Sequence, residues 1–155
     1  MDGVLNGARL ASLAALGSAA LLAGAFLFQA LGYAPCQMCI WQRYPHALAM
    51  AIGLIAFAIH HKGLRLVGAA ATLTTSAIGF YHAGVEQGWW QGPTTCSSTP
   101  IGDISADALL DQIMNAPLVR CDDIPWEMFG LSMAAWNGIL SLALAALWLT
   151  AYRRA

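Results

Sequence analysis

The stretch Pro35-Cys36-Gln37-Met38-Cys39-Ile40-Trp41-Gln42-Arg43 lies in a short break between two strongly apolar runs of the chain. Two cysteines separated by two residues form a readily reduced disulfide, and thiolates in such pairs often have depressed pKa values. Arg43 follows Cys39 by one helical turn, so both side chains project from one face if a helix begins by Cys39. A dithiol at the edge of an apolar run, with a cation nearby, indicates redox chemistry rather than a structural bridge.

The composition of the chain places it among membrane proteins. Of its 155 residues, 59% are hydrophobic and only 10% are charged, whereas a soluble domain usually carries about 25% charged residues. The length predicts a single domain. Its seven basic residues are scattered and form no basic patch, which argues against nucleic-acid binding.

Four apolar runs predict the fold. They cover about residues 10–31, 40–59, 64–82 and 129–149. A bilayer core needs about 20 such residues for each helix. We therefore expect an all-α membrane protein, a four-transmembrane-helix bundle with a short outer loop at 32–39 and a long one at 83–128. A cleaved signal peptide is the weaker interpretation of the first run, because its apolar core is too long and no Ala-x-Ala-like site closes it.

The distribution of Lys and Arg predicts the orientation of the bundle. Five of the seven basic residues lie on one side, namely Arg9, Lys62, Arg65, Arg153 and Arg154, and Arg43 and Arg120 lie on the other. By the positive-inside rule, both termini and the turn at His60–Gly63 are cytoplasmic. The two outer loops, which hold all four cysteines, then face outward. In a bacterial inner membrane that face is oxidising.

Part of the long loop has helical periodicity. Apolar residues of Ile101–Met114 fall on one face, and Asp103, Asp107 and Asp111 repeat every four residues on the other. Ser105 is a suitable N-cap for this short helix. Two interpretations remain open: a helix on the membrane surface that restrains the loop, or a solvated helix with an ordinary acidic face.

The four cysteines allow three kinds of chemistry. A tetrahedral zinc site usually has two closely spaced pairs, but Cys96 and Cys121 lie far apart in the sequence, so no metal is expected. Two structural disulfides are the stronger alternative to a redox role. Gly, Pro, Ser and Thr surround Cys96, and this composition predicts mobile cysteines that suit exchange with a soluble protein better than stapling.

The chain resembles a known family. Cys-Gln-Met-Cys-Ile-Trp-Gln-Arg-Tyr-Pro at 36–45 is similar to the CxxC-x3-Arg signature of the disulfide bond formation protein B (DsbB) family. The resemblance continues in Tyr81-His82-Ala83-Gly84-Val85-Glu86, Gly92-Pro93-Thr94-Thr95-Cys96, Arg120-Cys121-Asp122 and Pro125-Trp126-Glu127-Met128-Phe129-Gly130-Leu131-Ser132. It covers nearly the whole chain, and the motifs occur in the order that the family has them.

The resemblance implies a quinone-dependent protein-disulfide oxidoreductase of the bacterial inner membrane. Such an enzyme reoxidises a periplasmic, thioredoxin-like thiol oxidase of the DsbA type. Carried over by position, Cys96 receives the attack of the partner's thiol, and Cys121 is its disulfide mate. Cys121 then exchanges with Cys36, and Cys39 is the thiolate that faces the quinone.

The resemblance also implies a cofactor site in the membrane. Ubiquinone or menaquinone is the expected electron acceptor, with Arg43 in contact with it and His82 near it. A charged side chain costs roughly 2.5 to 3.5 kcal/mol at the centre of a membrane span and less near the interface. For Arg43, snorkelling to lipid headgroups is therefore the alternative to a quinone contact.

Two other functions remain to be distinguished. One is an enzyme that resembles vitamin K epoxide reductase, which also uses a CxxC at the membrane edge of a four-helix bundle. The order of cysteines argues against it, because in that family the loop pair precedes the CxxC. The other is a non-enzymatic four-helix membrane protein with structural disulfides.

Overall fold

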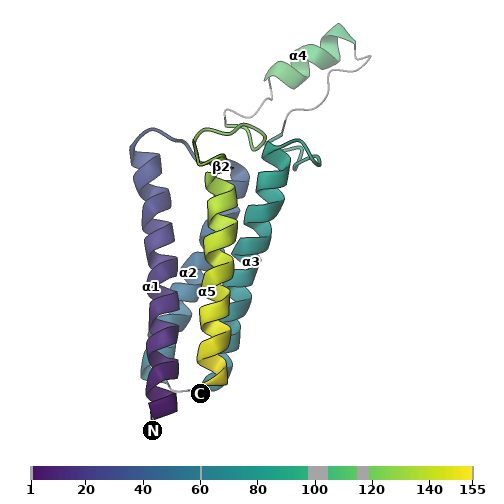
Figure 1. Ribbon diagram of the computed structural model, residues 1–155. Coiled ribbons are helices and arrows are strands. Elements are labelled where there is room, and N and C mark those ends of the chain that lie inside the picture. Colours follow the sequence, from purple (N-terminus) through teal and green to yellow (C-terminus); the bar gives the residue numbers. More distant parts are fainter. Residues whose placement is uncertain (1, 60, 98–104, 115–118, 155) are drawn as a thin grey trace.

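The fold is a bundle of four long helices with both marked chain ends at the same end of the bundle (Figure 1). The computed structural model describes residues 2–59, 61–97, 105–114 and 119–154. The long helices are α1 (Asp2–Ala30), α2 (Gln37–Ala58), α3 (Lys62–Glu86) and α5 (Met133–Arg153). The predicted helical architecture is confirmed; residue 60 of the predicted turn lies outside the described residues.

Two helix boundaries in the bundle differ from the predicted spans for identifiable reasons. Helix α2 begins at Gln37 because Cys36 is its N-cap, and the sulfur of Cys36 accepts the backbone N–H of Cys39 at 3.2 Å. Helix α3 continues beyond the predicted span to Glu86. Cys36 therefore ends the loop before α2, and Cys39 lies in the first turn of the helix.

A hairpin precedes α5 where the prediction placed the start of the last span. Strand β1 (Glu127–Met128) pairs antiparallel with β2 (Leu131–Ser132). The turn between them needs positive φ, which is 56° at Phe129 and 74° at Gly130, a conformation that stops an α-helix from starting there. Ser132 then caps α5 by accepting the backbone N–H of Ala135.

The long loop contains a short helix, α4 (Ala106–Met114). This part of the predicted amphipathic helix is confirmed, and residues 101–104 lie outside the described residues. Figure 1 shows α4 beyond the end of the bundle that carries the cysteine loops. Leu110, Ile113 and Met114 are exposed there. Whether these side chains rest on a membrane stays a prediction.

The bundle has polar groups inside and apolar side chains outside. Fully buried polar residues include Ser18, Thr72, Thr75 and Ser141, each 0% exposed, whereas Leu54 is 76% exposed and Phe57 is 78% exposed. A protein in water has the opposite arrangement, because exposed apolar surface is unfavourable there. Among the described residues, Gly7–Ala30 and Met133–Arg153 are also long and apolar enough to cross a membrane. The molecule is therefore a membrane protein.

Candidate redox site

The two cysteines of the CxxC motif lie side by side at the start of α2. Their sulfur atoms are 2.7 Å apart, and Cys36 is only 3% exposed. The structure shows both as thiols, so the disulfide expected between them stays a prediction. The close contact makes the two sulfurs one chemical unit, in which a proton or a negative charge on one directly affects the other.

The hydrogen bond between these thiols shifts their pKa values in opposite directions. Hydrogen bonding to Cys39 raises the pKa of the Cys36 thiol well above its usual range, and burial adds to this effect. The same hydrogen bond lowers the pKa of the Cys39 thiol, and the positive charge of Arg43 lowers it further. Cys39 is therefore the sulfur that carries the negative charge in the reduced pair.

The second cysteine pair forms a disulfide between Cys96 and Cys121, which confirms this pairing. Both cysteines are buried in this conformation, with Cys96 1% exposed and Cys121 0% exposed, and the mobility expected of them stays a prediction. Both pack in one apolar cluster with Cys36, Met38 and Val85. The loop composition predicted flexibility, but packing against the ends of α2 and α3 holds the disulfide in place.

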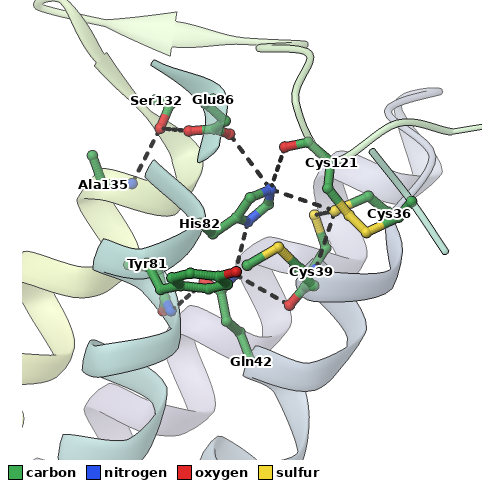
Figure 2. A network of polar contacts seen from close by, with 12 residues as sticks. Cys36, Cys39, Gln42, Tyr81, His82, Glu86, Cys121, Ser132 and Ala135 are labelled. Carbon is green, nitrogen blue, oxygen red and sulfur yellow. Dashed lines mark hydrogen bonds and ion pairs between the residues drawn. A yellow bond between two sulfur atoms is a disulfide. The ribbon is translucent and has the colours of Figure 1, made fainter. Parts of the chain in front are cut away.

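The two pairs meet around the imidazole of His82 (Figure 2). The sulfurs of Cys36 and Cys121 and a ring nitrogen of His82 all lie within 4.8 Å of one another. Nε2 of His82 is 3.6 Å from the sulfur of Cys36 and 3.2 Å from the carbonyl oxygen of Cys121. A sulfur from each outer loop is thus within a short movement of the other.

A chain of hydrogen bonds determines which nitrogen of His82 carries the hydrogen. The hydroxyl of Thr75 must donate to the backbone carbonyl of Gln42, at 3.0 Å, so its oxygen accepts from Nδ2 of Asn137. Nδ2 of Asn137 also donates to Oε1 of Gln42 at 2.7 Å, which turns Nε2 of Gln42 toward Nδ1 of His82 at 3.0 Å. Because Gln42 donates to Nδ1, the hydrogen of neutral His82 is on Nε2.

The tautomer of His82 determines whether its Nε2 donates or accepts hydrogen bonds beside the cysteine sulfurs. Its Nε2–H faces acceptors, the carbonyl of Cys121 and the sulfur of Cys36, and donates to a thiolate formed there. The three atoms are near enough for a metal ion. However, the sulfur of Cys121 is bonded to Cys96, and Nε2 of His82 has no lone pair free in this tautomer.

A buried carboxyl completes the cluster. The side chain of Glu86 is 3% exposed and lies 3.8 Å from Nε2 of His82. It accepts a hydrogen bond from the hydroxyl of Ser132, the N-cap of α5. Glu86 lies at the outer end of α3, beyond the predicted span, and burial raises its pKa to about 7.

The raised pKa of Glu86 makes the stability of the protein depend on pH. Its folded-state pKa is above its unfolded value near 4.5, so the stabilisation is complete below about pH 4.5 and is lost as pH rises through about 7. We expect the unfolding temperature of the detergent-solubilised protein to fall between pH 5 and 8, and Glu86→Gln to remove that part of the fall. Glu127→Gln, at an exposed carboxyl of the hairpin, is the control. Equal pH slopes for wild type and Glu86→Gln would contradict this expectation.

The state of the cysteines in the resting protein is a second testable point. We expect protein from an oxidising compartment to contain Cys36–Cys39 and Cys96–Cys121 as its disulfides. Alkylation under non-reducing conditions, followed by peptide mapping, measures this directly. Four alkylatable thiols would show that neither pair is oxidised at rest.

A cavity of about 450 Å³ opens beside the cysteines, between α1, α2 and α5. Its walls are mostly apolar, and the polar groups that reach it include Cys39, Gln42, Arg43, His46 and His82. Arg43 donates to Oε1 of Gln29 at 2.7 Å and lies over the ring of Phe26, 4.8 Å from its centre. The cavity thus brings Cys39, Arg43 and His82 together, and their contact with a quinone stays a prediction.

The residues that connect these groups were not among the predicted site residues. Gln42, Thr75 and Asn137 come from three different helices, and Glu86 appeared only as part of a motif. A signal was present, because each is a polar residue within or beside an apolar run, and a buried polar group needs a partner.

Comparison with known proteins identifies the family of the chain. The family model described as "Disulfide bond formation protein DsbB" matches residues 7–151. The chain belongs to the DsbB family. A disulfide bond formation protein B of Albidiferax ferrireducens is 34% identical over 92% of this chain and 87% of its own length. One of Azoarcus sp. is 36% identical over 88% of this chain and 87% of its own. No solved structure is significantly similar to the chain.

The range of the family match includes all four cysteines. Each of them, and all the residues of the polar chain around His82, falls within the matched range. Further relatives carry the same name, including one of Methylococcus capsulatus that is 36% identical over 83% of each chain. The family match therefore extends well beyond the CxxC motif.

Proposed function

We propose that this chain is a membrane thiol oxidase that takes electrons from a soluble, thioredoxin-like protein of the DsbA type and passes them to a membrane quinone. The observation that carries the proposal is the contact between the two cysteine pairs. The sulfurs of Cys36 and Cys121 belong to different outer loops, yet they lie within 4.8 Å of each other and of His82. Two purely structural disulfides have no need of this proximity.

The proposed relay is a sequence of thiol–disulfide exchanges. A thiolate of the partner attacks Cys96, which breaks the Cys96–Cys121 bond and releases Cys121 as a thiolate. Cys121 then attacks Cys36 of an oxidised Cys36–Cys39 pair and releases Cys39 as a thiolate. Each exchange forms one S–S bond and breaks another. The charge of Arg43 supports this order, because it favours the Cys39 thiolate and a stabilised thiolate leaves readily.

His82 supports the exchange between the loops. Its Nε2–H donates to the carbonyl of Cys121 and is 3.6 Å from the sulfur of Cys36. A donor at this place stabilises negative charge on either sulfur as the bond is exchanged. Since Cys96 is buried, the partner reaches it only after the loop segment that carries it has opened.

The residues around the cavity fit a quinone. Its walls are mostly apolar and suit a lipid-soluble ring, while Arg43 and His46 each have a buried nitrogen with no partner among the described residues. A bound quinone supplies the terminal acceptor for two electrons and two protons. Cys39, Arg43 and His82 are the residues that we propose to hold it. Ubiquinone and menaquinone both suit such a site.

We also propose that α1, α2, α3 and α5 all cross the bacterial inner membrane. On α2 and α3 the exposed side chains are largely apolar and the buried ones include polar groups, as expected for helices whose outer faces meet lipid. Figure 1 places both ends of the chain at one end of the bundle and the cysteine loops at the other. By the positive-inside rule the termini are cytoplasmic, and the loops at 32–39 and 83–128 are periplasmic.

The test is reduction of a quinone by purified protein. Protein in detergent receives a reduced thioredoxin-like thiol oxidase and a short-chain quinone, and the quinone absorbance is followed. We expect one quinone reduced for each partner disulfide formed. Partner oxidation without quinone reduction, or neither reaction, would contradict the proposed function.

A further inference from the structure

His46 of α2 is a buried residue with one unused nitrogen. It is 3% exposed and lines the same cavity as Cys39 and Arg43. Its Nε2 lies 2.9 Å from Oδ1 of Asn137, whereas its Nδ1 is buried and has no partner among the described residues. A buried polar atom left unpaired costs free energy, so its retention calls for a ligand.

The hydrogen-bond chain described above also determines the tautomer of His46. Because Nδ2 of Asn137 donates to Thr75 and Gln42, its Oδ1 is the atom that faces His46 and must accept. The hydrogen of neutral His46 is therefore on Nε2. Its Nδ1 has a lone pair and no hydrogen, so it accepts a hydrogen bond and cannot donate one.

An acceptor of this kind distinguishes the two redox forms of a quinone. The oxygens of an oxidised quinone carry no hydrogen and offer nothing to Nδ1. The hydroxyl groups of the reduced form, a para-hydroquinone, are donors. His46 is one of the residues that line the cavity, so a hydrogen bond to its bare Nδ1 would favour the hydroquinone over the quinone.

We propose that Nδ1 of His46 accepts a hydrogen bond from a hydroxyl of the hydroquinone in this cavity, and so makes the bound quinone a stronger oxidant. The proposal rests on the proposed function and adds a quinone-binding residue to it. The chain from Thr75 through Asn137 and Gln42 holds both histidines. It leaves the hydrogen of His82 on Nε2, beside the sulfur of Cys36, and it leaves a bare Nδ1 on His46, a residue of the cavity wall.

The test compares the affinities of the two redox forms. Fully oxidised protein has no thiols with which to reduce a quinone, so dissociation constants for decyl-ubiquinone and for decyl-ubiquinol can both be measured anaerobically in detergent. We expect His46→Leu to weaken the ubiquinol about three- to tenfold and to change the ubiquinone less than twofold. A tenfold change in this ratio lowers the potential of the bound two-electron couple by about 30 mV.

Two further measurements separate a specific role from a structural one. His46→Gln keeps a donor for Asn137 and an acceptor for the cavity, so it should recover most of the ubiquinol affinity. In wild-type protein labelled with ¹⁵N-histidine, ubiquinol should shift the Nδ1 resonance of His46 and ubiquinone should not. This spectrum decides the question even if His46→Leu fails to fold.

The outcomes distinguish an error in the role of His46 from an error in the proposed quinone site. If wild type binds both forms, and His46→Leu leaves their ratio unchanged or the Nδ1 resonance does not respond to ubiquinol, the role of His46 is wrong while the quinone site stands. If wild type binds neither decyl-ubiquinone nor decyl-ubiquinol, nor the corresponding short-chain naphthoquinone pair, the proposed quinone site is wrong as well.

Discussion

Cys96→Ala and Cys121→Ala are each expected to abolish oxidation of the soluble partner, with a loss of more than about a thousandfold in rate. Covalent relays fail when a nucleophile or its mate is removed, because no neighbouring group takes over the bond exchange. In Cys121→Ala the Cys36–Cys39 pair should still react with quinone. Its two sulfurs and the cavity beside them involve neither residue of the loop disulfide.

Two measurements check both halves of this expectation. Partner oxidation is followed with reduced partner in excess, and quinone-dependent loss of thiols is followed after chemical reduction of the variant. Ser97→Ala is the matched control, because Ser97 adjoins Cys96 in the same buried segment and its hydroxyl has no partner among the described residues. Wild-type turnover by Cys96→Ala would mean that the relay order is wrong.

Cys96→Ala has a further consequence that follows from the distances. The freed Cys121 lies within 4.8 Å of Cys36, so it should attack an oxidised Cys36–Cys39 pair and leave Cys39 as the free thiolate. Peptide mapping of this variant should therefore find Cys121 joined to Cys36. Its recovery as a free thiol would show that the two loops do not exchange in solution.

The helices of the bundle could be predicted because each is an apolar run of adequate length. The ends of the runs could not be located with the same certainty, because capping and turn geometry decide them. Cys36 caps α2 through its sulfur, so the helix starts before the predicted span. Phe129 looked like the start of the last run, but its positive φ places it in a hairpin turn.

The cysteines of the site could be predicted from spacing and family resemblance, but their surroundings could not. The prediction of mobility around Cys96 relied on composition, which says nothing of the apolar cluster in which Cys96 is buried. Likewise, Gln42 and Asn137 are 95 positions apart in the chain. Desolvation cost predicts that each finds a polar partner, but only the packing of the helices decides which one.

Arg43→Ala is expected to raise the apparent KM for quinone about ten- to a hundredfold. Arg43 is a permanently charged residue one turn beyond Cys39, and it lines the cavity with a buried Nε that has no partner among the described residues. Loss of a hydrogen bond from a charged donor costs roughly 1.5 to 3 kcal/mol, which corresponds to this range if KM follows binding. Arg43→Lys should recover only part of the affinity, because an ammonium group does not reproduce the planar fork of a guanidinium.

The contacts of Arg43 with α1 allow its role as an anchor to be separated from its role toward quinone. Its guanidinium donates to the side chain of Gln29 at 2.7 Å and is near the ring of Phe26. Gln29→Leu removes the hydrogen bond between Arg43 and the side chain of Gln29 and keeps the charge of Arg43. The attachment of Arg43 to α1 is therefore weakened in both Gln29→Leu and Arg43→Ala, whereas its contact with the quinone is lost only in Arg43→Ala. The measurement is a steady-state quinone titration of wild type and the three variants in detergent. Exchange between the partner and Cys96–Cys121 should stay nearly intact in all of them, since that step takes place in the loop. An unchanged KM and kcat in Arg43→Ala would leave Arg43 as an anchor to α1 and the lipid headgroups.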